Sequence, residues 1–324
     1  MKVTVMGAGA FGMSVAHRLS TNPGNDVAVW TASPDKYDEF ERTGVIESVL
    51  GGHPLPHDIE MTLSPKRASR ADIIFILTTA KYVESVCEKL KPYLDDGTKV
   101  IVGSKGACPD GAFPATVAAR VLERDISAIA GPGFAIDIME DVPVGFTFAS
   151  DDDEAYARAV EAFSHDRHFI LDRSHDIMGV ELCSCIKNAA ALACGALHGS
   201  GHPVSTQCLL MQRVLVDISR MLETIEGGSQ LTPMSLAGVG DMILTCFSPK
   251  SRNSTFGTIV GEYGYDSPEA REYLADNTVE GLTVVERWGD MSRMLGVESR
   301  FMDITGSVFC DDGSIEALTD YISS

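Results

Sequence analysis

The first half of the chain alternates short apolar runs with longer segments that have helical character. Helices are expected after the glycine-rich turn through about Thr21, at Val83–Leu94 and at Ala112–Leu122. Short apolar strands that alternate with helices indicate a mostly parallel sheet covered on both faces. The predicted strands are Lys2–Met6, Asp26–Thr31, Ala71–Thr79, Lys99–Gly103, Ser127–Ala130, Val144–Ala149 and His168–Leu171.

The pattern changes near Arg173. From His175 onward we find no convincing strand, and Gly, Pro, Asn and Asp separate segments that look helical. The sequence therefore predicts an α/β Rossmann-type doubly wound domain over residues 1–174 and an all-α domain over residues 175–324. The predicted helices of the second domain are Ile177–Leu197, Val204–Ile225, Pro233–Thr245, Thr255–Tyr263, Pro268–Ala275, Thr283–Leu295 and Ser314–Ile322.

The length of the chain indicates how many domains it has, and its charge excludes some classes of partner. A chain of 324 residues is long for one core, which agrees with two domains. A formal net charge of -20 repels nucleic acid and anionic membranes, so neither is an expected partner. No apolar run is expected to reach the length of a membrane span, and the N-terminus lacks the features of a signal peptide. We expect a cytoplasmic protein without stable membrane insertion.

A glycine-rich turn follows the first predicted strand. Gly7, Gly9 and Gly12 form the pattern GxGxxG, with Ala10 and Phe11 between the last two glycines. Such glycines let the backbone approach a pyrophosphate whose charge sits at the N-terminus of the next helix. The pattern alone is a weak signal, but its place at the start of a βαβ unit favours a dinucleotide site.

The end of the second predicted strand leaves the choice of cofactor open. An NAD site usually has an Asp or Glu there, whereas this chain has Trp30-Thr31-Ala32-Ser33. No arginine follows directly to bind a 2′-phosphate, although the hydroxyls of Thr31 and Ser33 would tolerate one. NAD and NADP both remain expected cofactors.

Lys187 is the only lysine between Gly106 and Pro249, and it lies in an otherwise apolar or small-residue segment, Cys183–Gly195. A buried ammonium is costly unless it is paired, and partial desolvation would lower its pKa toward neutrality. The alternatives are a catalytic lysine, a structural ion pair, or a side chain that reaches outward to water. Asp241, which follows a Gly-Val-Gly turn in apolar surroundings, is the expected partner.

Other candidate site residues follow predicted strands or lie in polar segments. Lys105 follows a strand, where it could reach a ligand or simply be a solvated loop lysine. The turn Gly131-Pro132-Gly133 could bind an anion or merely connect a strand to a helix. Arg252 and Asn253 offer donors suited to a phosphate, or could cap a helix. Eight scattered cysteines without CxxC spacing or a His cluster argue against a zinc site.

Taken together, these motifs resemble the soluble NAD(P)-dependent glycerol-3-phosphate dehydrogenase family. The motifs GAGAFG, GSKG, GPGFA, IKNAAALACG, LAGVGDMILTC, SRN and TVEG occur in the family's order and spacing, over nearly the whole chain. The resemblance implies a fold like that of 6-phosphogluconate dehydrogenase and an enzyme that interconverts dihydroxyacetone phosphate and sn-glycerol 3-phosphate with NAD(P)H. Such a reaction would feed phospholipid synthesis and needs no metal.

The resemblance also assigns roles to residues. Lys187 would be the proton donor and acceptor, Lys105 would lie near nicotinamide and substrate, and Asp241 would orient Lys187. Ala10, Phe11, Ala135 and Glu280 would approach the cofactor. Arg252 and Asn253 would hold the substrate phosphate, with Ser251 beside them. Thr31, Lys105 and Arg252 are also candidates for contact with the cofactor. The full set expected at the substrate is Lys105, Gly131, Gly133, Lys187, Asn188, Asp241, Thr245, Ser251, Arg252 and Asn253.

The chain departs from the family pattern at two places. His198 stands where the family has Asp, Ser205 where it has Asn, and Gly133 where Ser or Thr is usual. These changes are expected close to the substrate pocket, where they could admit another phosphorylated ketose or polyol, or they could be drift in a loop. A third hypothesis is a non-catalytic NAD(P) sensor. The expected partner is a small phosphorylated substrate, and because helical second domains of this kind often dimerise, a homodimer is also considered.

Overall fold

A computed structural model describes residues 1–51, 53–55, 58–140, 142–311 and 313–324. The chain packs as two compact units. The first contains Met1–Ser104, Pro114–Ile129 and Gly133–Ile177, and the second contains Lys105–Phe113, Ala130–Pro132 and Met178–Ser324. Two short segments of the N-terminal half therefore pack with the helical unit. The functional division at residues 174 and 175 stays a prediction.

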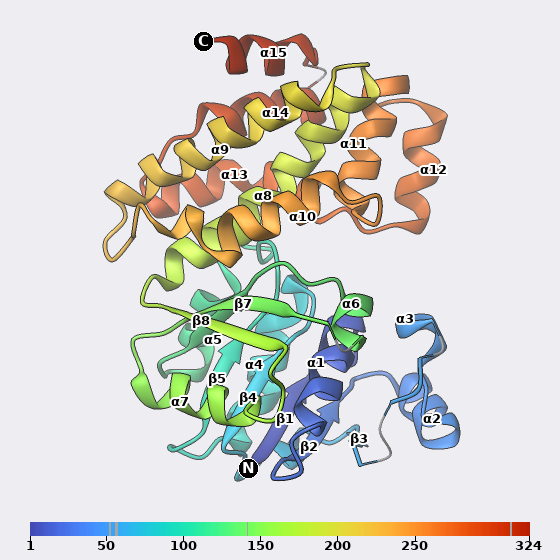
Figure 1. Ribbon diagram of the computed structural model, residues 1–324, viewed down its shortest axis with the longest axis vertical. Coiled ribbons are helices and arrows are strands. Elements are labelled where there is room, and N and C mark those ends of the chain that lie inside the picture. Colours follow the sequence, from blue (N-terminus) through green and yellow to red (C-terminus); the bar gives the residue numbers. More distant parts are fainter. Residues whose placement is uncertain (52, 56–57, 141, 312) are drawn as a thin grey trace. The chain divides into compact units, whose positions relative to one another are not determined.

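The first unit is built on an eight-stranded sheet of order β3-β2-β1-β4-β5-β6-β7-β8 (Figure 1). Every strand pair with a described register is parallel. The order runs in opposite directions on the two sides of β1, and ligands of such sheets bind beside the carboxyl ends of the strands at this reversal. The strands are β1 (Lys2–Met6), β2 (Asp26–Trp30), β3 (Glu60–Thr62), β4 (Ile73–Ile76), β5 (Lys99–Val102), β6 (Ser127–Ala130), β7 (Val144–Ala149) and β8 (Phe169–Ser174).

Apolar residues of the strands and helices form the core of the first unit. The four residues of β4 are fully buried, as expected for a strand covered on both faces. The prediction of a parallel α/β domain is confirmed. The helices of this unit are α1 (Ala10–Ser20), α2 (Pro34–Thr43), α3 (Glu47–Leu50), α4 (Val83–Leu90), α5 (Pro114–Leu122), α6 (Ala135–Met139) and α7 (Asp153–Ala162).

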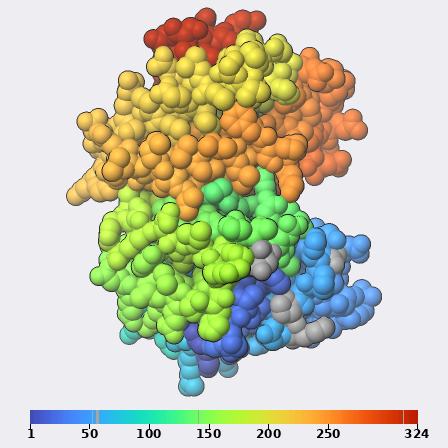
Figure 2. Space-filling view, in the orientation of Figure 1, coloured from blue at the N-terminus to red at the C-terminus, as the bar shows by residue number. Residues whose placement is uncertain are grey.

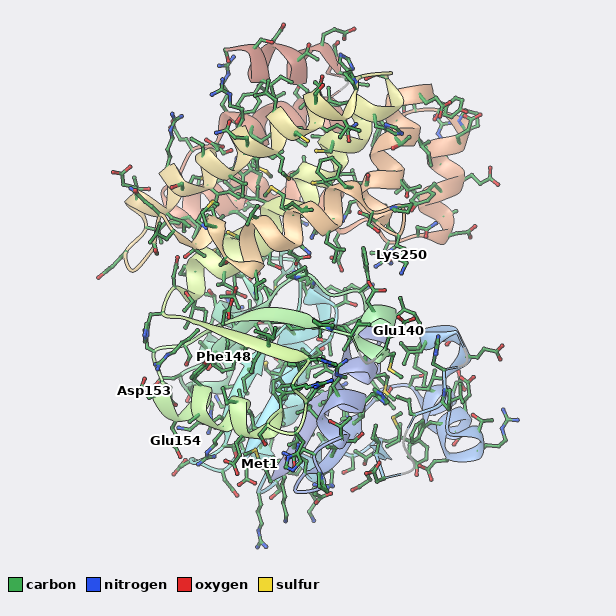
Figure 3. All side chains as sticks on the ribbon, viewed as in Figure 1. Met1, Glu140, Phe148, Asp153, Glu154 and Lys250 are labelled. Carbon is green, nitrogen blue, oxygen red and sulfur yellow. The ribbon has the colours of Figure 1, made fainter. Side chains whose placement is uncertain are left out.

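The helices α2, α3 and α7 and the strand β3 of the first unit were not expected from the sequence. Helix α7 begins with a strong N-terminal signal, because the side chain of Asp152 accepts hydrogen bonds from the N–H groups of Glu154 and Ala155. Asp153 and Glu154 add negative charge to its first turn (Figure 3). The apolar residues of α7 form too weak a pattern to predict a helix, whereas the cap at Asp152 marks where the helix begins.

The second unit is helical throughout its described C-terminal part, which confirms the prediction of an all-α region. Its α-helices are α8 (Ile177–Gly199), α9 (Val204–Thr224), α10 (Asp241–Phe247), α11 (Arg252–Tyr263), α12 (Pro268–Asp276), α13 (Glu280–Leu295), α14 (Arg300–Cys310) and α15 (Glu316–Ser323). Helix α14 was not expected from the sequence. In the space-filling view, α9 and α10, in yellow and orange, cover much of the visible face of this unit (Figure 2).

Helix α8 runs through the core of the second unit, and the residues from Gly179 to Leu197 are all buried. By length and composition it could cross a membrane, so the expectation that no apolar run reaches that length is wrong. However, 89% of its most apolar 18-residue window is buried inside the protein. A helix surrounded by other helices needs apolar residues on every side, which accounts for this composition.

Helices α8 and α11 approach so closely that their contact surface is made of glycine. A Cβ added to Gly257 would lie 2.1 Å from the carbonyl oxygen of Leu192, and one on Gly195 would lie 2.2 Å from that of Ser254. Only glycine allows backbones to pack at this separation. The contact brings the middle of α8 beside the start of α11.

The single helix predicted over Pro233–Thr245 is wrong. The segment is instead a 3₁₀ turn (Thr232–Met234), a π-helical turn (Leu236–Gly240) and then α10. Ser235 has extended backbone geometry between the first two turns, and its hydroxyl accepts a hydrogen bond from the N–H of Gly238 at 3.3 Å. This break places Asp241 at the start of α10.

Candidate active site

The glycine-rich turn of the first unit has the local geometry of a dinucleotide site. Gly7 has a φ of +132°, and a Cβ on Gly12 would lie 2.0 Å from the carbonyl oxygen of Gly7. Both positions therefore exclude larger residues. A Cβ on Gly9 would meet nothing within 4 Å, and no side chain caps α1 there. The first turn of α1, which contains Ala10 and Phe11, thus begins beside open space at Gly9.

Thr31 lies at the end of β2, as expected, and is 4% exposed. Its Oγ1 accepts a hydrogen bond from the N–H of Ser33 at 3.1 Å. Ser33 in turn caps α2. The end of β2 thus presents two ordered hydroxyl groups and no carboxylate within Trp30–Ser33.

In the second unit, Lys187 lies at the middle of α8 and is 3% exposed. Its Nζ donates a hydrogen bond to Oδ2 of Asp241 at 2.5 Å and a weaker one to Oγ1 of Thr245 at 3.4 Å. The outward-pointing alternative for this lysine is therefore wrong. The ammonium has three N–H groups, so this arrangement leaves one of them for another acceptor.

Asp241 joins two lysines. Its Oδ2 also accepts a hydrogen bond from Nζ of Lys105 at 3.3 Å, and Lys105 donates to the carbonyl oxygen of Gly131 at 3.4 Å. Lys105 is about one-fifth exposed, whereas Asp241 is almost completely buried. The segment that carries Lys105 packs into the second unit through Ala107 and Phe113, which fixes this lysine beside α10.

Burial and charge set the protonation of this cluster. Burial lowers the pKa of Lys187 to about 8, an effect that Asp241 opposes and Lys105 reinforces. Burial would raise the pKa of Asp241, but the ammonium groups of Lys105 and Lys187 outweigh it and keep that pKa below its usual value. Asp241 is thus a fixed anion, and Lys187 is the group that can exchange a proton near neutral pH.

A second polar network lies beside this cluster. Nδ2 of Asn253 donates to Oδ1 of Asn188 at 3.0 Å, and Oδ1 of Asn253 accepts the N–H of Gly281 at 2.9 Å. Asn188 also donates a long hydrogen bond to the carbonyl oxygen of Ser184. Each amide group keeps one N–H outside these bonds. The network links α8, α11 and α13 and orients the two asparagines.

Ser251 and Arg252 begin α11. The hydroxyl of Ser251 caps the helix by accepting the N–H of Ser254 at 3.2 Å, so the helix starts three residues earlier than predicted. The side chain of Arg252 is exposed and, within the described residues, forms no ion pair. A guanidinium at a helix N-terminus without a carboxylate partner is suited to an anionic ligand.

The remaining candidates divide between the units. Glu280 begins α13, and a Cβ added to Gly106 would lie 4.0 Å from the Cβ of Glu280. The charge of Glu280 raises the pKa of Lys187 against the effect of burial. Gly133 and Ala135 belong to the first unit, where Ala135 begins α6. Among the described residues, no group of three or more His, Cys, Asp or Glu is placed to hold a metal ion.

Comparison with known proteins decides the family. Residues 2–156 match the model of the NAD-dependent glycerol-3-phosphate dehydrogenase N-terminus, and residues 176–320 match the model of its C-terminus. A glycerol-3-phosphate dehydrogenase [NAD(P)+] of Coxiella burnetii is 30% identical over 283 residues, which are 86% of this chain and 83% of that protein. The chain belongs to the NAD-dependent glycerol-3-phosphate dehydrogenase family.

Other members of the family are similar to this chain over almost its full length. The glycerol-3-phosphate dehydrogenase [NAD(P)+] of Bartonella tribocorum is 29% identical over 99% of this chain and 96% of its own. The crystal structure of glycerol-3-phosphate dehydrogenase from Coxiella burnetii has a TM-score of 0.89 at 26% identity, and covers 100% of this chain and 99% of that one. The yeast enzyme shares the fold, with a TM-score of 0.87 at 19% identity over 100% of this chain and 99% of that one.

The structure gives local reasons for the departures from the family pattern. A Cβ on Gly133 would lie 2.7 Å from Cζ of Phe146, so the aromatic ring in this chain explains the glycine. His198 lies about three helical turns beyond Lys187 on α8, an axial distance of about 16 Å, and its side chain is exposed. The expectation that the segment 198–206 lies close to the substrate pocket stays a prediction.

Sequence reasoning missed the part played by Gly281. It follows Glu280 in the TVEG motif, and a Cβ there would lie 2.7 Å from the carbonyl oxygen of Asn188. Gly281 thus lets α13 approach α8 and supplies the N–H that fixes Asn253. The only available signal was a glycine near the start of a predicted helix, which does not indicate its partner.

Proposed function

We propose that this protein interconverts dihydroxyacetone phosphate and sn-glycerol 3-phosphate, with NAD(P)H as the hydride carrier, and that residues 1–174 bind the cofactor while 175–324 bind the substrate. The observation that carries the proposal is the buried Lys187–Asp241–Lys105 cluster in a member of this family. A location in the cytoplasm and a homodimeric state stay predictions from the sequence.

Lys187 acts as the proton donor and acceptor. In the direction of reduction, its free N–H donates to the carbonyl oxygen of the ketone, and the proton follows as the oxygen becomes an alcohol. In the direction of oxidation, the neutral amine takes the hydroxyl proton. A pKa of about 8 supports both directions, because both forms of Lys187 are populated near neutral pH.

Asp241 and Lys105 act through charge and position. The carboxylate of Asp241 holds the Nζ of Lys187 in place at 2.5 Å and balances its charge in a buried setting. Lys105, which is partly exposed, provides a second ammonium beside the same carboxylate and can contact the substrate or cofactor. Thr245 donates to the carbonyl oxygen of Asp241 at 2.6 Å and thus steadies the first turn of α10.

The phosphate group of the substrate is held by Arg252, with an N–H group from Asn253 and Asn188. Arginine forms paired, charge-assisted hydrogen bonds with phosphate oxygens. The phosphate is bound away from the reacting carbon, so the energy of that binding serves to orient the carbonyl group. In a protein with a net charge of -20, such a local cation is needed to attract an anionic substrate.

The residues of the first unit fit a dinucleotide. Gly9 leaves open space beside the start of α1, where the pyrophosphate would lie against the N–H groups of Ala10 and Phe11. When bound, the reduced nicotinamide supplies the hydride to the substrate carbon. Thr31 and Ser33 follow β2, where the adenosine ribose would lie, so their hydroxyl groups would be its neighbours.

The test is a coupled measurement of turnover and binding. Purified protein is mixed with dihydroxyacetone phosphate and NADH or NADPH, and absorbance of the reduced nicotinamide is followed. We expect consumption, and a loss of at least about 10²-fold in kcat for Lys187→Met with cofactor binding retained. Cofactor binding without turnover of this substrate would instead indicate the NAD(P) sensor. A higher kcat/KM for another phosphorylated ketose would reassign the substrate.

A further inference from the structure

The end of β2 is the place where Rossmann-type folds distinguish NAD from NADP, because the adenosine ribose lies there. A carboxylate at this position binds the 2′-hydroxyl and repels a 2′-phosphate. In this chain the strand ends in Trp30, and Thr31, Ala32 and Ser33 follow. Asp26 lies at the opposite end of β2, and the side chain of Asp35 on α2 is exposed.

Lys36 brings a positive charge to this region. It lies on the first turn of α2, which is fixed because Oγ of Ser33 accepts its backbone N–H at 3.3 Å. Its side chain reaches back to the glycine-rich turn, where Nζ donates to the carbonyl oxygen of Ala8 at 3.2 Å. The ammonium is therefore held between the turn after β1 and the turn after β2.

The charge of Lys36 is available to a ligand. Among the described residues it forms no ion pair, and its one described side-chain bond, to a neutral carbonyl, uses one of three N–H groups. Two hydroxyl groups accompany it. Thr31 and Ser33 each accept a backbone N–H in this segment, so the hydroxyl protons of both can be donated. An ammonium and two hydroxyls form a donor set that suits a phosphate dianion.

We propose that Lys36 binds the 2′-phosphate of NADP(H), with Thr31 and Ser33 as further donors, and that this protein therefore binds NADP(H) more tightly than NAD(H). The inference rests on the proposed function only in that a nicotinamide dinucleotide is the cofactor. Lys36 discriminates between the two cofactors and takes no part in hydride or proton transfer.

Calorimetric titration tests this inference without turnover. The ligands are NADPH, NADH, 2′,5′-ADP and 5′-AMP, and the proteins are the wild type, Lys36→Met, Lys36→Arg and the control Lys66→Met. Lys66 is exposed on the 3₁₀ turn Pro65–Ala68 of the same unit, so its substitution removes one positive charge elsewhere. Circular dichroism melting confirms that each variant is folded.

We expect the wild type and Lys66→Met to bind NADPH at least about tenfold more tightly than NADH. Lys36→Met should weaken the binding of NADPH and of 2′,5′-ADP about tenfold or more. It should weaken the binding of NADH and of 5′-AMP less than about twofold. Lys36→Arg should keep most of the preference, since the charge remains.

Three results would overturn the inference. The wild type could bind NADH more tightly than NADPH, or Lys36→Met could lose affinity equally for both cofactors, or it could lose affinity for neither. Equal loss would show that Lys36 only ties α2 to the glycine-rich turn. These results leave turnover of dihydroxyacetone phosphate intact and so are distinguishable from failure of the proposed function. A folded protein that binds neither cofactor would remove both proposals.

Discussion

At the scale of single residues, one buried lysine carries most of the chemical argument. Lys187 could be buried in α8 only because Asp241 lies 2.5 Å away and Thr245 offers a weaker contact. A pair of this kind contributes little to stability, because desolvation of both charges offsets their attraction. Its value lies in a proton-exchanging amine that is held in one position.

The pH dependence of the reaction should follow Lys187, whose pKa is lowered to about 8 by burial. Because reduction needs the ammonium, kcat/KM for dihydroxyacetone phosphate should fall as pH rises through about 8. Oxidation of glycerol 3-phosphate needs the neutral amine, so its kcat/KM should rise over the same range. Steady-state kinetics in both directions, at constant ionic strength, would measure the two profiles.

The variant Asp241→Asn is the control for that assignment. Asp241 raises the pKa of Lys187 against burial, so its neutralisation should move both inflections to lower pH. If the inflections stay at the wild-type pH, the titrating group is not Lys187.

Arg252 should act on substrate affinity through the phosphate group. Its guanidinium is exposed and, within the described chain, unpaired with a carboxylate. We expect Arg252→Ala to lower kcat/KM by about 10²-fold, the loss of one or two charge-assisted hydrogen bonds. Lys250→Ala removes a nearby loop cation and serves as the matched control. An equal effect of both variants would show general electrostatic attraction in place of direct binding.

At the scale of elements, the glycine contact between α8 and α11 determines where site residues meet. The close approach of the helices allows Asn188 on one to bond Asn253 on the other at 3.0 Å. The start of α11 is in turn set by the Ser251 cap. The prediction of a helix from Thr255 missed this, since Arg-Asn-Ser after the cap has no apolar periodicity.

Substitution of a contact glycine should therefore destabilise the second unit. A Cβ in Gly257→Ala would lie 2.1 Å from the carbonyl oxygen of Leu192, so the helices must separate, at a cost of about 3 kcal/mol. In the control Gly289→Ala, on α13, the nearest atom is the guanidinium end of Arg293 at 3.7 Å. That change should stabilise by about 0.5–1 kcal/mol, because alanine favours helix.

Urea unfolding measures the two changes in free energy. A Gly257→Ala variant as stable as the wild type would show that the helices do not pack at this separation. Because the contact supports the position of Asn253, we also expect Gly257→Ala to lower kcat/KM under conditions in which the protein is still folded.

At the scale of the whole molecule, charge is the dominant feature. Acidic residues outnumber basic residues by 46 to 26, which gives the net charge of -20. Self-repulsion of this excess destabilises the compact state, and salt screens it. We expect the free energy of unfolding to rise by about 1 kcal/mol between low salt and 0.5 M NaCl, a shift of about 2–4 °C in Tm.

Scanning calorimetry in NaCl and in KCl would test this, because screening does not depend on which of the two cations is present. A fall in Tm with salt would indicate that attractive ion pairs, such as that between Arg18 and Asp166, outweigh the repulsion.

The sequence by itself determined the parallel strands, the helical second half, the glycine-rich turn and the presence of an unusual lysine. These follow from local patterns, since strand periodicity and glycine geometry depend on neighbouring residues. Lys187 and Asp241 could be paired by elimination, because a buried ammonium needs an anion and few candidates lie in apolar segments.

Only the tertiary structure decided which residues meet. The sharing of Asp241 by Lys105 and Lys187, the network of Asn188, Asn253 and Gly281, and the reach of Lys36 to Ala8 each join segments far apart in the chain. Such contacts depend on helix packing distances and on where caps begin each helix, and neither leaves a periodic signal.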